Sequence, residues 1–306
     1  MKEQSVFRGI YPMTFAVFDG QEERLVQEGI VAQVKAMIAA GVHGVGVLGL
    51  ASEVNRLTNY ERRQMLEWVC EAVGGRLPVS VTVGESSRSA QVETLRAAAQ
   101  NGAAWAILQP PSVPGTSEAG LVRFFGWVAE RSELPLGIQN APEHFGYGLS
   151  AEGLRTLNRN HPNVYMLKLE SAAVTQIQVI DETEGAYRLF SGRGGAELPA
   201  LIKAGCAGAV TGIESCDVVA RIFDLSVRGD KDSVTEAERL AAELGPLLML
   251  IFENMDRFLV YAKRLAGIRL NLGELAPRTP FTPATDFGLN VVTRYAQLYG
   301  SLPPGE

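Results

Sequence analysis

Short apolar runs rich in β-branched residues recur along the chain, and longer segments with the spacing of amphipathic helices lie between them. Because strands and helices alternate, we expect the strands to pair in parallel and to be buried on both faces. Eight strand-helix units at this spacing predict an α/β fold, a closed (β/α)8 or TIM barrel, rather than a doubly wound sheet. The predicted strands span residues 9–17, 44–49, 79–83, 105–109, 136–139, 165–169, 187–191 and 208–211.

Several helices in the first part of the chain carry start signals. Thr58 and Glu61 have the spacing of a capping box, in which each residue bonds the backbone N–H of the other. Ser117 and Ser150 are predicted N-caps, since a serine hydroxyl can accept from a free N–H of the first turn. The helices that these signals begin are predicted at residues 62–73, 118–131 and 151–160.

After residue 211 the pattern predicts helices only, with an irregular connector at 273–283. We interpret residues 1–213 as the barrel and residues 214–306 as a C-terminal helical extension packed on it. No linker rich in Pro, Gly or Ser separates the two parts, so we expect one structural domain. The helices predicted in the extension span residues 218–228, 234–250, 256–265 and 286–298.

Composition narrows the class of protein. With 46% hydrophobic and 20% charged residues, the 306-residue chain is ordinary for a soluble globular protein. A net charge of -6 disfavours a nucleic-acid partner, and no apolar run approaches the ~20 residues that cross a bilayer. The first thirteen residues lack the apolar centre of a signal peptide. Three widely spaced cysteines without a CxxC pair favour reduced thiols, so we expect a cytoplasmic protein.

The sequence gives little sign of a metal or nucleotide site. His43, His144 and His161 form no HxxxH or HExxH pattern, and no GxGxxG or GxxxxGK[ST] motif is present. We therefore interpret each histidine as a loop or strand-edge residue rather than a metal ligand. No metal or organic cofactor is expected.

One lysine stands out by its surroundings. Lys168 lies in the apolar strand VYMLKL, near the strand end where the active site of a (β/α)8 barrel forms. A desolvated amine at that place can attack a carbonyl carbon. The alternative is a structural lysine at the barrel mouth, paired with Glu170 or Glu53. The other five lysines are in polar or helical segments, where a solvated ammonium is expected: Lys2, Lys35, Lys203, Lys231 and Lys263.

Motifs around Lys168 occur in a characteristic order. They are LGLASE with LT and ER in residues 48–62, PLGIQNAP in 135–142, GAVTG in 208–212 and RTPFTP in 278–283. Together they resemble, nearly end to end, the dihydrodipicolinate synthase / N-acetylneuraminate lyase family of class I aldolases and dehydratases. The resemblance implies a (β/α)8 barrel in which Lys168 forms a Schiff base with a 2-keto acid. It also implies a homo-oligomer, a tetramer or a dimer.

The chain departs from the synthases and lyases of this family at the site itself. Their strand-five tyrosine, which relays a proton, is Gln139 here, and an amide is neither a general acid nor a general base at neutral pH. Their two threonines, which help to hold the substrate carboxylate, are Leu50 and Ala51. The familiar retro-aldol relay is therefore not expected.

The pattern is more similar to the L-2-keto-3-deoxyarabonate dehydratase branch of the family. That branch also has a strand-five glutamine, a Ser-Glu pair after strand two, a K-x-E-[ST] motif on strand six and a Glu-Asn pair in the C-terminal helices. The corresponding segments here are IQNAP, Ser52-Glu53, KLES and Glu253-Asn254. One departure is Asn140, where the branch has Asp.

These residues suggest a mechanism as a hypothesis. Lys168 condenses with the C2 ketone of a 2-keto-3-deoxy sugar acid, the iminium acidifies C3, and the enamine expels the C4 hydroxyl. A five-carbon substrate would give 2-oxoglutarate semialdehyde, a step in carbohydrate-acid catabolism. Glu170 lies two residues beyond Lys168 and so points to the same side of an ideal strand. It is either the acid/base or a structural partner of Lys168.

Further residues are assigned provisional roles in this site. Gln139 is expected to orient a hydroxyl or a water, and Tyr147 is an alternative proton donor. Ser52 and backbone N–H groups of the loop after strand two would hold the carboxylate. Arg193 is either a partner for a distal acid group or a surface residue, and Glu53 is expected to be a buried structural acid. The predicted substrate contacts are Leu50, Ala51, Ser52, Asn140, Gly192, Arg193 and Thr211.

Two other functions stay open. A pyruvate-dependent aldolase or lyase of the same family would cleave a pyruvate unit from an aldehyde and release pyruvate. A ligand-binding homologue would have kept the barrel and lost the chemistry, although a lysine in an apolar strand is costly without a task. In every case the expected partner is a small-molecule 2-keto acid, with no nucleic acid and no membrane.

Overall fold

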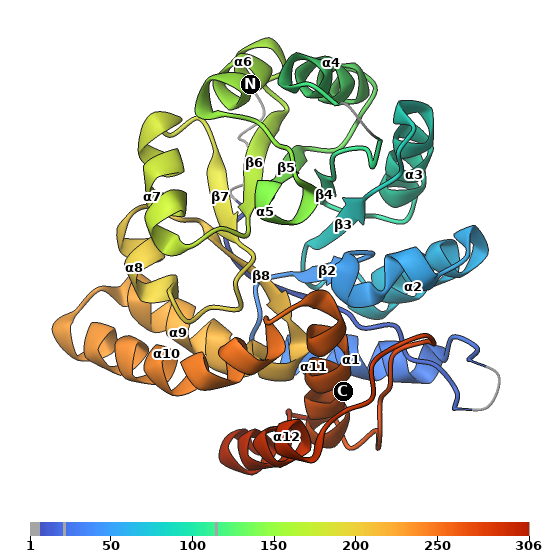
Figure 1. Ribbon diagram of the computed structural model, residues 1–306, viewed down its shortest axis with the longest axis vertical. Helices are drawn as coiled ribbons and strands as arrows, with labels where there is room; N and C mark the ends of the chain where they lie inside the picture. The colour runs from blue at the N-terminus through green and yellow to red at the C-terminus, as the bar shows by residue number, and fades with distance from the viewer. Residues whose placement is uncertain (1–6, 21–22, 114–115, 306) are drawn as a thin grey trace.

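A computed structural model of the chain describes residues 7–20, 23–113 and 116–305. Lys2 and the first six residues of the segment considered for a signal peptide lie outside the described residues. Eight parallel strands close into a barrel in chain order, with β1 paired to both β2 and β8 (Figure 1). The predicted (β/α)8 fold is confirmed. The strands are β1 (Gly9–Met13), β2 (Val45–Val47), β3 (Val79–Val83), β4 (Trp105–Leu108), β5 (Leu136–Asn140), β6 (Val164–Leu169), β7 (Arg188–Ser191) and β8 (Gly208–Gly212).

Helices surround the strands in a ring, as Figure 1 shows. The predicted capping box is present: Thr58 Oγ1 accepts from the Glu61 N–H, and a Glu61 carboxylate oxygen accepts from the Thr58 N–H at 2.8 Å. Ser117 and Ser150 cap their helices as predicted. The helices up to β8 are α1 (Gln27–Ala39), α2 (Asn59–Val73), α3 (Arg88–Gln100), α4 (Glu118–Ala129), α5 (Pro142–Phe145), α6 (Ala151–Asn160), α7 (Ala173–Glu182) and α8 (Leu198–Lys203).

The helix after β8 completes the ring. α9 (Cys216–Arg228) packs on β1 and β8, so it takes the place of the eighth barrel helix within the segment predicted as the extension. Beyond it, α10 (Lys231–Ile251) packs along α9, and α11 (Met255–Arg269) packs on α10 and on α12 (Asp286–Tyr299) (Figure 1). The extension is therefore joined to the barrel by continuous helix packing.

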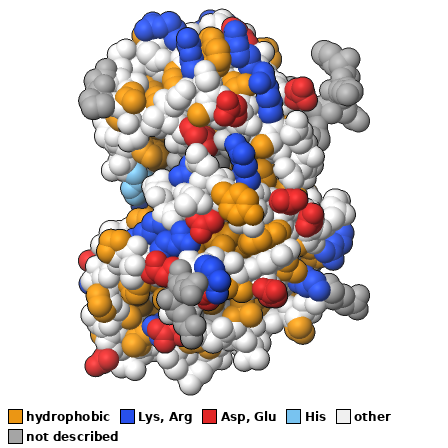
Figure 2. Space-filling model, turned by 90° about the vertical axis from the view of Figure 1, so that its right-hand side faces the viewer, with side chains coloured by type: hydrophobic (Ala, Val, Ile, Leu, Met, Phe, Trp, Pro, Cys, Tyr) orange, Lys and Arg blue, Asp and Glu red, His pale blue; other side chains and the backbone are white. Residues whose placement is uncertain are grey.

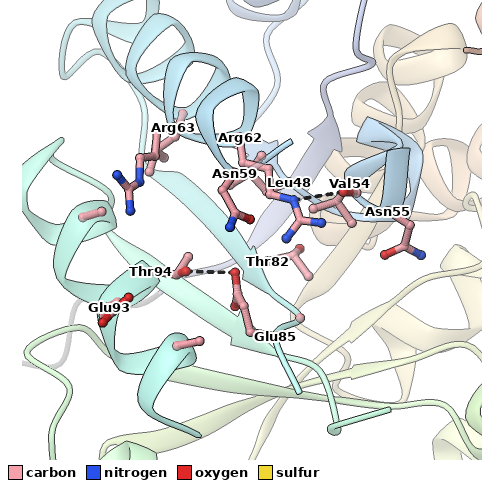
Figure 3. Close-up of a pocket in the computed structure, with 14 residues that line it drawn as sticks. Leu48, Val54, Asn55, Asn59, Arg62, Arg63, Thr82, Glu85, Glu93 and Thr94 are labelled. Carbon is pink, nitrogen blue, oxygen red and sulfur yellow. Dashed lines mark hydrogen bonds between the residues drawn. The ribbon is translucent and has the colours of Figure 1, made fainter. Parts of the chain in front are cut away.

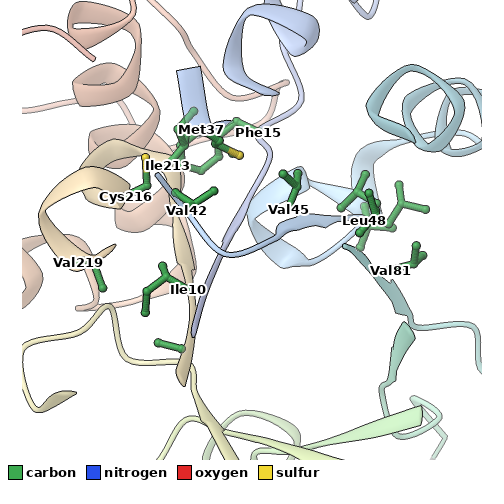
Figure 4. Packing of buried hydrophobic residues seen from close by; sticks show 14 of the residues in the cluster. Ile10, Phe15, Met37, Val42, Val45, Leu48, Val81, Ile213, Cys216 and Val219 are labelled. Carbon is green, nitrogen blue, oxygen red and sulfur yellow. The ribbon is translucent and has the colours of Figure 1, made fainter. Parts of the chain in front are cut away.

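The apolar core has two parts. One lies between the strands and the helices, where Figure 4 shows Ile10, Met37 and Ile213 among its members. The other fills the barrel interior, where the Tyr11 and Phe190 rings lie 5.4 and 5.2 Å from the Trp105 ring, measured between centroids. Large side chains from β1, β4 and β7 therefore fill the barrel below its carboxyl end, as in packed barrels of this type.

The surface and the helices bear on two classes that composition disfavours, nucleic-acid-binding proteins and membrane proteins. On the face shown in Figure 2, acidic and basic side chains are interspersed with apolar ones. Within the described residues, no helix combines the length and the hydropathy that a membrane span requires.

A buried ion pair joins the extension to the barrel. The Lys263 ammonium on α11 bonds a carboxylate oxygen of Glu53 in the loop after β2, and both side chains have no exposed surface. Lys263 also donates to the Ala276 carbonyl at 2.8 Å. Glu53 accepts at its other oxygen from the Arg278 backbone N–H at 2.9 Å and from Arg56 at 3.1 Å. Glu53 is thus a buried structural acid, as expected.

The prediction that Lys263 is solvated was wrong. Its partner, Glu53, is 210 residues away in the sequence, so no local pattern indicated the contact. Burial lowers the pKa of Lys263, and the neighbouring Glu53 carboxylate opposes that shift. Of the remaining described lysines, Lys203 and Lys231 are exposed and Lys35 is half-buried.

We expect Lys263→Met to lower the free energy of unfolding by about 3–5 kcal/mol, because it leaves the Glu53 carboxylate buried without its ammonium partner. Urea unfolding at neutral pH measures this loss. Lys263→Met combined with Glu53→Gln removes both charges and is expected to lose clearly less than the single variant. A single variant as stable as the wild type would show that the ion pair does not support the fold.

Candidate active site

The site is centred on two side chains at the carboxyl end of β6. Lys168 pairs in register with Gln139 of β5 and Phe190 of β7, and its side chain is only 15% exposed. Its Nζ lies 2.6 Å from Oε1 of Glu170, the residue that follows β6. Of the two partners that the sequence left open for Lys168, the structure therefore brings Glu170 to it, whereas Glu53 is bonded to Lys263.

Glu170 is the hub of the polar contacts. Its Oε1 also accepts from the Gln139 amide at 2.6 Å, and its Oε2 lies 2.9 Å from Nε2 of His144. Burial disfavours the carboxylate, but the Lys168 charge and the hydrogen bonds from His144 and Lys168 outweigh it and lower the pKa of Glu170 to about 2. At neutral pH this site therefore holds an ionised carboxylate that three donors share.

Gln139 is fixed by a chain of amides. Its carbonyl oxygen accepts from the Gln109 amide at 2.9 Å, and its own NH₂ group donates to Glu170. Gln109 follows β4, and its backbone carbonyl accepts from Gln91 of α3. Gln109 is the last residue of the strand predicted at 105–109, and no role was predicted for it. These hydrogen bonds hold the Gln139 amide toward Glu170. There the amide can orient a neighbouring group but cannot transfer a proton.

The loop after β5 brings His144 to the site. This histidine, interpreted from the sequence as a loop residue, lies on the short helix α5 and is the second site residue without a predicted role. Its hydrogen bond with Glu170 raises the pKa of His144, since the adjacent carboxylate stabilises the imidazolium. A polar residue two positions after a proline at a strand end was the available signal, and it is weak.

Two neighbouring cavities lie at Lys168 and Glu170, and we call them the inner and the outer chamber. The inner one, about 50 Å³, is bounded by Met13 and Val210 below, by the β2 loop and by apolar side chains of the extension: Phe252, Met255 and Phe258. The outer one, about 630 Å³, is lined by residues that include His144, Arg193 and Met249. Glu170, Gly192 and Phe252 border both chambers, so Glu170 is part of the wall of each space.

Gly192 sits where a side chain would disturb both reactive groups. A Cβ there would lie 2.7 Å from Cγ of Glu170 and 3.1 Å from Cε of Lys168. The Gly192 N–H donates to the Leu169 carbonyl at 2.7 Å, which fixes this close approach. Residue 192 is therefore glycine because any larger side chain would collide with Glu170 and Lys168.

The loop after β2 is tightly bent. Leu48 and Glu53 have left-handed φ values of 63° and 55°, which are unusual for residues with side chains. Between them the 3₁₀ turn η1 (Leu50–Ser52) begins at the cavity, and the N–H groups of Ser52 and Glu53 bond carbonyls inside the turn. A turn of this kind supplies no internal acceptor for its first N–H groups, here those of Leu50 and Ala51.

The predicted contacts divide into two groups. Leu50, Ala51, Gly192 and Thr211 line the inner chamber with Lys168 and Glu170, and Arg193 lines the outer chamber, where it pairs with Glu197 at 3.4 Å. Ser52, Asn140 and Tyr147 instead direct their polar side-chain atoms to backbone groups elsewhere.

The bonds of these three side chains explain their placement. The Ser52 hydroxyl donates to the Thr14 carbonyl at 2.6 Å and anchors the β2 loop to the segment after β1. Asn140 bonds both backbone groups of Leu149, at 2.9 and 2.8 Å, and the Tyr147 hydroxyl donates to the Pro111 carbonyl. The bonds of Asn140 and Tyr147 fix the loop that carries His144.

A second cavity, about 190 Å³, lies between α2 and α3 (Figure 3). Arg62 donates to the Val54 carbonyl at 3.0 Å, and Thr94 donates to Glu85 at 2.9 Å along its wall. None of the residues predicted for the Schiff-base site lines it, so it is separate from the Lys168 chambers.

Comparison with known proteins gives a consistent result. The sequence model of the Dihydrodipicolinate synthetase family matches residues 6–297. A protein of Exiguobacterium sibiricum named 4-hydroxy-tetrahydrodipicolinate synthase is 29% identical over 267 residues, which cover 87% of this chain and 86% of the relative. A protein of Coccidioides immitis, provisionally named mitochondrial 4-hydroxy-2-oxoglutarate aldolase, is 28% identical over 286 residues and 91% of each chain.

The fold has similar solved structures. One is a prophage protein of E. coli K12, described as belonging to the dihydrodipicolinic acid synthase family and solved in complex with pyruvate. It superposes with a TM-score of 0.85 at 22% sequence identity and covers 96% of this chain and 99% of its own. At this identity the likeness concerns the fold.

The low pKa of Glu170 predicts a pH dependence of stability. A carboxyl group whose pKa falls on folding stabilises the protein above its unfolded value, near 4.5, and this stabilisation is lost as pH falls toward 2. Between pH 6 and pH 3.5 we expect the wild type to lose about 1 kcal/mol more free energy of unfolding than Glu170→Gln. Glu61, whose pKa is also about 2, titrates in both proteins and cancels. Equal losses in urea titrations would contradict the assignment.

Proposed function

This chain belongs to the Dihydrodipicolinate synthetase family, and from that premise we propose that it is a Schiff-base-forming lyase that dehydrates a 2-keto-3-deoxy sugar acid. One observation carries the proposal. The carboxylate of Glu170 lies against the Lys168 amine, while the strand-five position that would hold a proton-relaying tyrosine is occupied by Gln139. The group available to move a proton next to the Schiff base is thus a carboxylate just after the strand that carries the lysine.

The first stage forms the iminium. The proton that Lys168 must release before it attacks has an acceptor 2.6 Å away in Glu170. The amine adds to the C2 ketone, the carbinolamine loses water, and the resulting iminium withdraws electrons from C3. The lysine supplies the electron sink itself, so the proposed chemistry requires no metal or organic cofactor.

The second stage eliminates water. The Glu170 carboxylate takes a proton from C3 and gives an enamine, and the enamine expels the C4 hydroxyl. For a five-carbon 2-keto-3-deoxypentonate, tautomerisation and hydrolysis from Lys168 then release 2-oxoglutarate semialdehyde. The overall reaction is the loss of one water molecule.

The chambers suggest how the substrate lies. The free N–H groups of Leu50 and Ala51 at the start of η1 can hold the C1 carboxylate beside the Lys168 amine. The inner chamber has room for the reacting end only, so C4 and C5 extend past Glu170 into the outer chamber. There Arg193 is available for a distal polar group, in competition with its ion pair to Glu197.

An aldolase is the second candidate. The relative provisionally named 4-hydroxy-2-oxoglutarate aldolase matches 91% of this chain, so a lyase that cleaves a carbon-carbon bond is the alternative that this relative favours. An aldolase must remove a proton from the C4 hydroxyl, whereas a dehydratase must give one to it. The products therefore separate the two: cleavage releases pyruvate and dehydration does not.

We expect borohydride to trap pyruvate on Lys168 as a reduced adduct, which peptide mass spectrometry locates. Lys168→Met should give no adduct, while Lys35→Met, a half-buried lysine on α1, should label as the wild type does. With 2-keto-3-deoxypentonates the wild type should form a semialdehyde without pyruvate. Pyruvate release would favour the aldolase, and failure of every 2-keto acid to label Lys168 would favour a binding protein.

Glu170→Gln tests the base separately from the Schiff base. In D₂O the enamine exchanges the methyl protons of pyruvate, so exchange followed by NMR reports proton transfer at C3 alone. We expect the variant to lose this exchange by about 10²–10⁴-fold while it still forms the borohydride adduct. The surface variant Glu130→Gln should exchange normally. Undiminished exchange in Glu170→Gln would reassign the base.

A further inference from the structure

His144 meets Glu170 on the side away from Lys168. Lys168 bonds Oε1 at 2.6 Å, and Nε2 of His144 lies 2.9 Å from Oε2. The three groups therefore follow one another in the order amine, carboxylate, imidazole. The reacting atoms of the proposed substrate have the same order, with C2 on the amine, C3 next to it and the C4 hydroxyl beyond.

The imidazole lies in the chamber where C4 is expected. His144 lines the outer chamber, whereas Lys168 lines the inner one, and Glu170 borders both. The His144 side chain is 53% exposed, so a substrate hydroxyl or a water can reach the ring without a rearrangement of the core.

The surrounding loop holds His144 in this place. Asn140 bonds both backbone groups of Leu149 and closes the loop at its base. The Tyr147 hydroxyl bonds the Pro111 carbonyl and ties the same loop to the segment after β4. Asn140, predicted as a substrate contact, and Tyr147, considered as an alternative proton donor, therefore act as positioning residues for the loop that carries the histidine.

The proposed elimination needs an acid at C4. Hydroxide is a poor leaving group, so its departure is helped by a proton delivered as the C4–O bond breaks. Lys168 is committed as the iminium, and the Gln139 amide does not transfer protons at neutral pH. Among the described polar groups that contact Glu170, His144 is then the one whose side-chain type ordinarily exchanges a proton near neutral pH.

We propose that His144 is the general acid that protonates the C4 hydroxyl as it leaves; this rests on the proposed dehydratase function. Together, His144 and Glu170 account for both protons that move in the elimination. Glu170 gains the proton from C3, the imidazolium gives its proton to the hydroxyl, and water departs. Transfer of the C3 proton from Glu170 to His144 along their 2.9 Å contact restores both groups.

The charges facing His144 favour its protonated form. The carboxylates of Glu170 and Glu143 raise the pKa of His144, while burial and the Lys168 charge oppose the rise. Arg193 lines the same chamber and is paired with Glu197. The dehydration rate should accordingly fall as pH rises through the titration of His144, and this alkaline fall should disappear when the ring is removed.

His144→Gln tests the proposal with the full-length protein. Dehydration of 2-keto-3-deoxypentonate should fall by about 10²–10⁴-fold, while borohydride trapping and methyl exchange of pyruvate stay within about fivefold of the wild type, because pyruvate has no C4 hydroxyl. A 4-deoxy-4-fluoro analogue, whose fluoride leaves with less need of an acid, should lose much less rate in the variant. The matched control is His161→Gln, at the end of α6 before β6, with wild-type activity expected.

The outcomes separate this proposal from the proposed function. If the wild type forms no Lys168 adduct, the Schiff-base function fails and the role of His144 fails with it. If the wild type dehydrates its substrate and His144→Gln does so equally well, only the general-acid role is overturned. Equal losses of dehydration, fluoride elimination and methyl exchange in the variant would show that His144 supports the site structurally and is not the acid.

Discussion

The buried ion pair between Glu53 and Lys263 is the constraint on which the site depends. Two charges withdrawn from water are stable only with full hydrogen bonding, and here Arg56, the Arg278 N–H and the Ala276 carbonyl complete the set. The pair fixes the end of the β2 loop, in which Leu50 and Ala51 line the inner chamber. It also joins that loop to α11, which begins at Met255 in the chamber wall. The extension is thus part of the site rather than an appendage.

The second requirement is an ionised carboxylate inside the barrel mouth. Burial alone would favour neutral Glu170, yet Lys168, Gln139 and His144 all direct donors to it and keep it charged. Lys168 and Gln139 bond one carboxylate oxygen, and His144 contacts the other. In the proposed mechanism, this division lets Glu170 act on C3 with one oxygen while the other stays in contact with His144.

Much of the fold could be predicted from the sequence because its signals are local. Alternating apolar runs and helical spacing predicted the closed barrel, and the Thr58–Glu61 spacing predicted a capping box that forms. Among the helices for which no bounds were predicted, α1, α7 and α8 begin without a side-chain cap bond, so they offered no local start signal. Lys263 was misjudged since its partner is remote in the sequence.

The candidate site could be predicted where strand geometry decides direction, and less well where loops do. Residues two apart in an extended segment point to the same side, and this put Glu170, just after β6, beside Lys168. Whether a loop side chain faces the cavity depends on the backbone groups that compete for it. Ser52 and Asn140 lie in the right segments, but carbonyl and N–H groups of neighbouring loops take up their polar atoms. The His144 side chain bonds no backbone group among its described contacts and so remains available to Glu170. In the proposed mechanism, the fixed shape of this loop is therefore what places the general acid.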